Sequence, residues 1–328
     1  MVLGVDGVRV GTWTAPGAVT GCTVVVPPPG TVGALAVRGA APGTREAAAL
    51  SPAGTVTTCH AVVLAGGSAY GLAAADGVMT RLEAAGVGHP VPGAVVPIVG
   101  AAIVLDAAVG DPTVRPGPDA GAAAYDAALA DDAAPVEGRV GAGAGCTVAK
   151  VAGLEHAWRS GQGVAVRRAG GVTVAALVVN NALGEVVDAD GTWLARARVP
   201  DGTPRYPRLD PPDPRADPGP DPGSEQAAAD AGRANTVIGV VVTDARLTKA
   251  DVHRVADLAH SGVARAVRPA HTALDGDALF GLATGTVDAG PAAVDLVADL
   301  AADAVADATR RAVRLATGDA TLPGLADG

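Results

Sequence analysis

The dipeptide Asn235-Thr236 is the feature of this sequence that most directly indicates chemistry. A hydroxyl residue stands there at the start of an apolar run, Thr236–Thr243, which is typical of a strand buried on both faces. A long proline-rich segment precedes it, and a tether that leads to a hydroxyl at the tip of a core strand indicates a chain that cuts itself. The cut would leave a free α-amino group beside the hydroxyl of Thr236, which is a known way to activate a weak nucleophile. An ordinary strand entry is the alternative, since dipeptides recur by chance.

Two carboxylates follow in the run HTALDGDALFGLATG, residues 271–285, where Asp275 and Asp277 flank a glycine. Side chains two residues apart in an extended segment point the same way, so the carboxylates can converge. One would orient the amine and hydroxyl of Thr236 while the other moves a proton, because like charges held close raise one pKa. A solvated Asp-Gly turn is the alternative. His271 with these carboxylates would make a metal site, but no other His or Cys cluster supports it, and we expect neither metal nor cofactor.

Two further groups have the chemistry to stabilise an oxyanion. Lys150 ends the glycine-rich run 141–150, and Asn180 and Asn181 end an apolar run. The lysine would supply a cation and an asparagine would supply an amide donor. A surface lysine and an Asx turn are the alternatives. The glycines lack the spacing of a P-loop or a dinucleotide fingerprint, so we expect no nucleotide site.

The run GGSAYG, residues 66–71, also contains a hydroxyl between glycines. A serine-hydrolase elbow needs glycine two residues on each side of the serine, and Tyr70 occupies the second of these places. We therefore expect Ser68 to begin a helix, with the glycines allowing close packing.

Strands and helices must position these groups. The sequence patterns that indicate them are short and are separated by turns. Thr248 and Asp251 resemble a capping box, and Gly86 suits a left-handed helix end. Pro291 suits the first turn of the last helix and Gly318 its end. We expect strands at 22–26, 56–64, 163–168, 172–179 and 236–243, and helices at 68–85, 120–130, 249–267 and 291–317, which together favour sheets covered by helices on their outer faces.

Composition limits the class of protein. The chain has 328 residues, of which 49% are hydrophobic and 2% aromatic, so a large core must be built from Ala, Val, Leu and Gly. The net charge of −10 and the pI near 5.0 argue against a nucleic-acid partner. Three dispersed cysteines argue against a disulfide scaffold and a zinc cluster. No signal peptide or apolar run of about 18 residues is visible, so we expect a cytoplasmic protein that does not cross a membrane.

Residues 200–233 differ from the rest of the chain because they are rich in proline and poor in large apolar side chains. Such a composition cannot repay the entropy of ordering, so we expect a surface loop or linker.

Six runs, in this order, resemble the self-processing peptidases that include the β-peptidyl aminopeptidases and the D-esterase/L-aminopeptidases. Among them, the branch of the nylon-oligomer hydrolases, which cleave 6-aminohexanoate oligomers internally, looks most similar. The resemblance covers nearly all of the chain except the linker. The runs are GCTVVVPPPG (21–30), RGAAPGTRE (38–46), HAVVLAGGSAYGLAAADGV (60–78), GRVGAGAGCTVAK (138–150), NTVIGVVVTDA (235–245) and HTALDGDALFGLATG (271–285).

The resemblance implies a single α/β domain, residues 1–328, folded as a four-layer αββα sandwich of the N-terminal-nucleophile type. It implies autocleavage into residues 1–235 and 236–328, and assembly of the cleaved heterodimers into a homo-oligomer, often a tetramer. The residues that match the nylon branch are Thr236 as nucleophile after Asn235, the pair Asp275 and Asp277, Lys150, and Asn181, which fits better than Asn180 because Ala-x-Gly follows it.

The expected activity is therefore hydrolysis of linear amides such as 6-aminohexanoate oligomers, through an acyl-enzyme on Thr236. An aminopeptidase acting on short peptides or β-peptides is the main alternative. That branch has a Ser nucleophile, with Ser and Glu at the places of Asp275 and Asp277, and this chain departs from it at all three. An uncleaved binding protein and an acetyltransferase of related fold are further alternatives.

Overall fold

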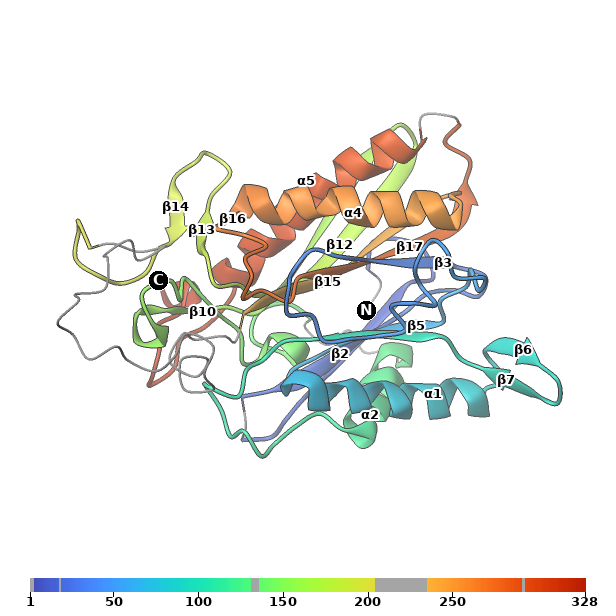
Figure 1. Cartoon of the computed structure of the whole chain (residues 1–328), viewed down its shortest axis with the longest axis horizontal. Coiled ribbons are helices and arrows are strands. Elements are labelled where there is room, and N and C mark those ends of the chain that lie inside the picture. Colours follow the sequence, from blue (N-terminus) through green and yellow to red (C-terminus); the bar gives the residue numbers. More distant parts are fainter. Residues whose placement is uncertain (1–2, 18, 131–135, 204–234, 291–292) are drawn as a thin grey trace, which may run out of the picture.

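The computed structural model describes residues 3–17, 19–130, 136–203, 235–290 and 293–328. Most of the proline-rich segment 200–233, together with Pro291, therefore lies outside the described residues. Within the described part, two five-stranded sheets lie between two pairs of helices (Figure 1).

The first sheet has the strand order β11-β12-β15-β17-β3 and carries the candidate nucleophile at the start of β15. Its strands pair antiparallel, except that β15 and β17 run parallel. Their bounds are β11 Gln162–Ala169, β12 Val172–Asn181, β15 Thr236–Ala245, β17 Ala278–Val287 and β3 Val32–Val37.

The second sheet has the order β1-β2-β5-β8-β4, with β5 and β8 parallel. Its bounds are β1 Arg9–Thr14, β2 Gly21–Val26, β5 Ala61–Ala65, β8 Val99–Ile103 and β4 Thr44–Arg45. Short ribbons at the periphery are β6 His89–Val91 with β7 Ala94–Val96, β9 Thr147–Val148 with β10 Trp158–Arg159, and β13 Glu185–Val187 between β14 Trp193–Ala195 and β16 Val267–Arg268.

The outer layers are α4 and α5 on the first sheet and α1 and α2 on the second (Figure 1). Three separate apolar clusters fill the spaces between the four layers. The αββα sandwich that the sequence predicted is thus confirmed. The helices are α1 Ala74–Ala84, α2 Pro118–Leu129, α4 Lys249–Ala266 and α5 Ala293–Arg314.

Strand β15 shows why an apolar run without alternation indicates a buried strand. Val237 and Val241 pack toward α4 and α5, whereas Ile238, Val240 and Val242 pack between the sheets. Both faces are therefore covered, and no polar side chain is needed on either one.

Several expected element boundaries differ from those in the structure. The helix expected at 68–85 begins as a 3₁₀ turn, Ser68–Ala73, before α1, and Gly86 does end it with φ +70°. The strand expected at 56–64 forms only from Ala61 to Ala65, and α5 ends at Arg314 rather than near Gly318. The capping box of Thr248 and Asp251 is confirmed at the start of α4. In the described part, none of the helices combines the length and apolarity needed to cross a bilayer.

Because aromatic residues are scarce, the core depends on close packing of backbones. Gly262, between α4 and α5, provides a test of this packing. A Cβ at this position of α4 would lie 2.1 Å from the carbonyl oxygen of Ala302 on α5. We expect Gly262→Ala to lower the free energy of unfolding by about 1–3 kcal/mol, because the helices must separate. At the control position Gly117 no atom lies within 4 Å of such a Cβ, so Gly117→Ala should cost about 1 kcal/mol at most. Urea unfolding measures both, and equal stabilities of the two variants would contradict this packing.

Candidate active site

The candidate site lies where β12 ends and β15 begins. Asn181, the last residue of β12, pairs with Thr236, the first residue of β15. On the other side of β15, Asn235 forms an isolated parallel bridge with Asp275, just before the parallel pairing of β15 with β17. Strand pairing therefore brings the acidic loop and the end of β12 to the Asn235-Thr236 peptide from opposite sides.

The Thr236 hydroxyl is directed back along its own chain. Its Oγ1 donates to the carbonyl oxygen of Asn235, and the Gly276 N–H donates to the same oxygen at 3.1 Å. The hydroxyl thus lies against the carbonyl that it would attack, while an amide donor polarises that carbonyl. A Cβ on Gly276 would lie 2.5 Å from the carbonyl oxygen of Ala41, so a glycine is needed here. Sequence reasoning missed the Gly276 amide, although the glycine between two aspartates was a visible signal.

Both aspartates are buried, which contradicts the alternative of a solvated turn. The Oδ2 of Asp275 accepts from the N–H and hydroxyl of Thr272 at 2.9 and 2.5 Å, and its Oδ1 accepts from the Leu183 N–H at 3.4 Å. Burial, and then the charge of Asp277, raise the pKa of Asp275. A raised pKa is expected for a carboxyl group that is buried beside a second carboxylate.

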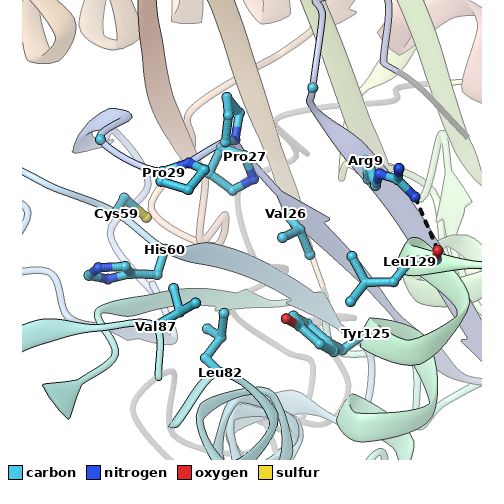
Figure 2. Close-up of a pocket in the computed structure, with 13 residues that line it drawn as sticks. Arg9, Val26, Pro27, Pro29, Cys59, His60, Leu82, Val87, Tyr125 and Leu129 are labelled. Atoms are coloured by element: carbon cyan, nitrogen blue, oxygen red, sulfur yellow. Dashed lines mark hydrogen bonds between the residues drawn. The ribbon is translucent and has the colours of Figure 1, made fainter. Parts of the chain in front are cut away.

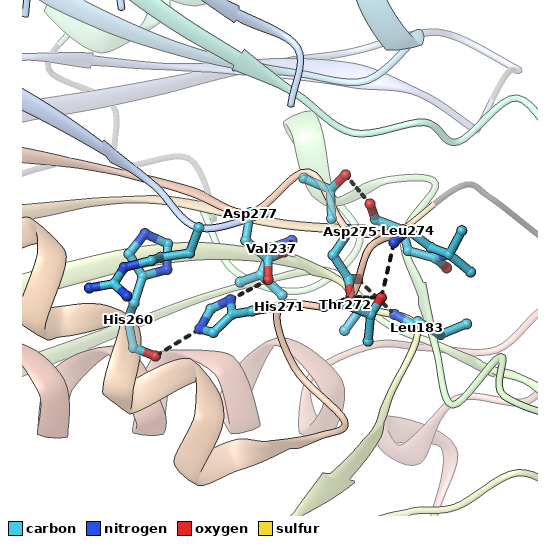
Figure 3. Close-up of polar contacts among 12 residues, drawn as sticks. Leu183, Val237, His260, His271, Thr272, Leu274, Asp275 and Asp277 are labelled. Atoms are coloured by element: carbon cyan, nitrogen blue, oxygen red, sulfur yellow. Dashed lines mark hydrogen bonds and ion pairs between the residues drawn. The ribbon is translucent and has the colours of Figure 1, made fainter. Parts of the chain in front are cut away.

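Asp277 contacts the nucleophile strand one residue beyond Thr236. Its Oδ1 accepts from the Val237 N–H at 2.6 Å, and its Oδ2 lies 2.6 Å from Nδ1 of His271 (Figure 3). Within the described residues, neither Asp277 nor Asp275 hydrogen-bonds to the Thr236 hydroxyl while the peptide is intact.

Lys150 is buried rather than at the surface, with 6% of its area exposed. Its Nζ donates to the main-chain oxygen of Asn181 at 2.9 Å and to its Oδ1 at 3.2 Å. Burial lowers the pKa of this lysine to about 7, so the amine can gain or lose a proton near neutrality. The Leu183 backbone connects the two sides of the site, because its carbonyl accepts from the Lys150 N–H and its N–H reaches Asp275.

The two asparagines at the end of β12 point to opposite faces of the sheet. Asn181 accepts from Lys150 and from the Thr147 N–H, and its Nδ2 donates to the Leu105 carbonyl at 3.1 Å. Asn180 instead donates to the carbonyl of Thr309 on α5. Alternation along the strand therefore places Asn181 with Lys150 and directs Asn180 away from the site.

The sequence indicated only one role for His271, that of a metal ligand. The described residues contain no group of three or more His, Cys, Asp or Glu side chains that could hold a metal ion. The three cysteines are buried and free. His271 instead pairs with Asp277, as described above.

A small apolar cavity of about 30 Å³ lies beside Lys150. It shares Leu105 and Asp106 with a cavity of about 200 Å³ that extends toward Ser68, Tyr70 and Arg115. Asp106 is buried, its Oδ1 accepts from the Gly67 N–H at 2.8 Å, and burial raises its pKa. The wall of the smaller cavity is made by Leu105, Asp106, Ala108, Val109, Gly145, Thr147, Lys150 and Leu154.

A larger cavity of about 290 Å³ lies away from these groups (Figure 2). Its wall includes the apolar side chains of Pro27, Leu82 and Leu129, together with His60 and Tyr125. Since none of the candidate catalytic residues lines this cavity, size alone does not locate the candidate chemistry in this fold.

Comparison with known proteins is consistent with this geometry. The chain matches peptidase family S58 over residues 1–323. It is 47% identical over 277 residues to a Mycobacterium leprae protein described as an uncharacterized aminopeptidase, covering 82% of this chain and 72% of the relative. It is 32% identical over 287 residues to the 6-aminohexanoate-oligomer endohydrolase of Paenarthrobacter ureafaciens, covering 86% of this chain and 74% of the relative.

Solved structures share the fold. A Burkholderia sp. β-aminopeptidase superposes with a TM-score of 0.70 at 21% identity, covering 98% of this chain and 89% of that one. The L-aminopeptidase D-Ala-esterase/amidase of Ochrobactrum anthropi, described as a variant of the Ntn hydrolase fold, superposes with a TM-score of 0.67 at 19% identity, covering 97% and 87%. The predicted N-terminal-nucleophile type of sandwich is therefore confirmed.

The burial of Lys150 has a consequence for stability that can be measured. Its pKa falls from the usual 10.5 to about 7, so between these pH values the unfolded chain binds more protons than the folded one. Stability should therefore rise with pH across this window and level off below it. Lys150→Met removes the amine, so the difference in unfolding free energy, wild type minus variant, should increase from pH 7 to pH 10 in urea titrations. A difference that does not change with pH would contradict the lowered pKa.

Proposed function

Because the chain belongs to peptidase family S58, whose members hydrolyse amide bonds, we propose that it is a self-cleaving amidohydrolase with Thr236 as its nucleophile. The observation that carries the proposal is the contact of the Thr236 hydroxyl with the Asn235 carbonyl, which the Gly276 N–H polarises. A hydroxyl held against a carbonyl beside an amide donor needs little reorganisation to attack it.

In processing, Oγ1 of Thr236 attacks the carbonyl carbon of Asn235, and the hydroxyl proton is transferred to the peptide nitrogen as the C–N bond breaks. The resulting ester joins Asn235 to the threonine side chain, and water hydrolyses it. The products are residues 1–235 and residues 236–328, the second of which begins with a free α-amino group.

In turnover, the same hydroxyl attacks the amide carbonyl of a substrate. The α-amine of Thr236 accepts the hydroxyl proton, since the usual pKa of an α-amine is about 7.7–8.0. Lys150 and Asn181 stabilise the oxyanion, and Asp275 and Asp277 hold the threonine and move the proton to the leaving amine. Water then releases the acyl group from Thr236. We further propose that the two chains stay together in a homo-oligomer.

The proposed substrate is a linear amide without side chains, such as a 6-aminohexanoate oligomer. Support comes from the 32% identity to a 6-aminohexanoate-oligomer endohydrolase.

An aminopeptidase is the second candidate, and Asp106 is the observation that favours it. An enzyme that removes amino-terminal residues needs an acid to bind the substrate ammonium, and Asp106 lines both cavities beside Lys150. Its Oδ1 accepts from the Gly67 N–H, and the Thr20 hydroxyl lies beside the same carboxylate. A substrate ammonium would add a charged partner to this carboxylate.

The proposed nucleophile is tested by Thr236→Ala, which should remain one chain of 31.7 kDa without amidase activity. Thr236→Ser keeps the hydroxyl and should still be processed before residue 236. A denaturing gel and the amino-terminal sequence of the smaller fragment measure both outcomes. Cleavage of the Thr236→Ala chain at the same bond would refute the mechanism.

The two candidate substrates are separated by product analysis and by Asp106→Asn. If the oligomer proposal is correct, 6-aminohexanoate oligomers are cut internally, and Asp106→Asn changes this rate less than about threefold. If the enzyme is an aminopeptidase, single amino-terminal residues appear, and Asp106→Asn raises KM for aminoacyl p-nitroanilides about tenfold or more, because a charged hydrogen bond is lost. Asp111→Asn is the matched control, since this carboxylate is exposed in the same loop.

A further inference from the structure

His271 contacts Asp277 from the side opposite to the nucleophile strand. Its Nδ1 lies 2.6 Å from Oδ2 of Asp277, and its Nε2 lies 3.2 Å from the main-chain oxygen of His260 (Figure 3). Both ring nitrogens therefore face acceptors, and only the doubly protonated imidazolium can donate to both. The contacts select the charged form of this histidine.

The backbone at His271 is in the left-handed region, with φ +55°. This conformation is costly for a residue with a Cβ and persists where surrounding contacts over-determine it. Here the unusual backbone directs the ring at Asp277. An unfavourable conformation that serves a buried carboxylate indicates a role beyond packing.

Asp277 connects this histidine to the nucleophile. The carboxylate is 1% exposed, and its other oxygen accepts from the Val237 N–H, next to Thr236. Burial removes the hydration of a carboxylate, and charge and hydrogen bonds must compensate for it. His271 supplies a charge on one side and Val237 supplies a hydrogen bond on the other.

The far side of the His271 ring lines a cavity of about 230 Å³, which also contains Arg38, Asp257 and His260. Arg38 pairs with Asp257, so these two charges largely offset each other. Burial lowers the pKa of His260 to about 4, so its ring is neutral near physiological pH. Of the groups around the ring, Asp277, then the main-chain oxygen of His260 and, more weakly, Asp275 favour the imidazolium. Together they outweigh burial, and the pKa of His271 is raised.

We propose that His271 is a positioning residue, whose imidazolium pairs with the Asp277 carboxylate and holds it fixed against the start of β15. The expected effect of His271 on turnover rests on the proposed function. The pairing of His271 with Asp277 does not depend on it. As pH rises through the pKa of His271, the imidazolium loses its proton, and the neutral ring holds Asp277 less firmly. Histidine thus transmits external pH to a carboxylate that solvent does not reach.

The kinetic test compares His271→Asn with His271→Ala. Asparagine tolerates the left-handed backbone and can place an amide donor where Nδ1 lies, but it cannot become charged. Below the pKa of His271, we expect kcat of His271→Asn to be about tenfold below wild type, and His271→Ala to be lower still, because a charge-assisted hydrogen bond is replaced or lost. The ratio of wild-type to His271→Asn kcat should fall toward one as pH rises. A ratio that is constant with pH would overturn the proposal.

The same substitution at an exposed histidine, His89→Asn on β6, is the matched control and should leave kcat and its pH profile unchanged. A similar change in the pH profile of kcat in His89→Asn would show that the effect is not specific to His271, and it would also count against the proposal.

A second measurement does not depend on turnover. Nuclear magnetic resonance titration of the histidine rings, with His271 assigned from the signal missing in His271→Asn, should give a pKa above the usual value of about 6.5. In Asp277→Asn this pKa should fall. A pKa at or below 6.5 in the wild type, or one unchanged in Asp277→Asn, would refute the link. If the link holds but no amide is hydrolysed, the proposed function fails and the pairing of His271 with Asp277 stands.

Discussion

The parallel pairing of β15 with β17 is the constraint on which the candidate site depends. Parallel strands begin at the same edge of a sheet, so the loop before β17 must lie beside the start of β15. The bridge between Asn235 and Asp275 extends this pairing beyond the strands. The antiparallel neighbour β12 then ends at the same edge with Asn181. Three strand ends thus assemble polar groups at one point of an apolar sandwich.

This edge is buried, and burial gives its ionisable groups their properties. Removal of water lowers the pKa of Lys150 and raises that of Asp275. Both pKa values are thereby brought closer to neutral pH, where an acid or base transfers protons most effectively. Asp277 has different partners, because an amide N–H and an imidazole contact its two oxygens. Two carboxylates of one type, two residues apart, are thus differentiated by their partners.

The composition of the chain explains how such a site can be enclosed without aromatic side chains. Glycines allow backbones to approach closely, as Gly262 does between α4 and α5 and Gly276 does beside Thr236. Close approach at Gly276 brings an amide N–H to the Asn235 carbonyl. Close backbone approach at glycines therefore packs the core and also provides a polar contact in the site.

The sequence by itself determined the buried strand after Asn235, the capped helix after Thr248 and, through family resemblance, the αββα sandwich. These follow from local periodicity, capping chemistry and ordered motifs, which the linear chain contains. It also singled out Thr236, Asp275, Asp277, Lys150 and, through the resemblance, Asn181, which the structure brings to one edge. Only the tertiary structure decided that Asn181 and not Asn180 faces Lys150, that the Gly276 amide polarises a carbonyl, and that His271 pairs with Asp277. Such contacts depend on strand register and backbone direction, and no spacing along the chain specifies these.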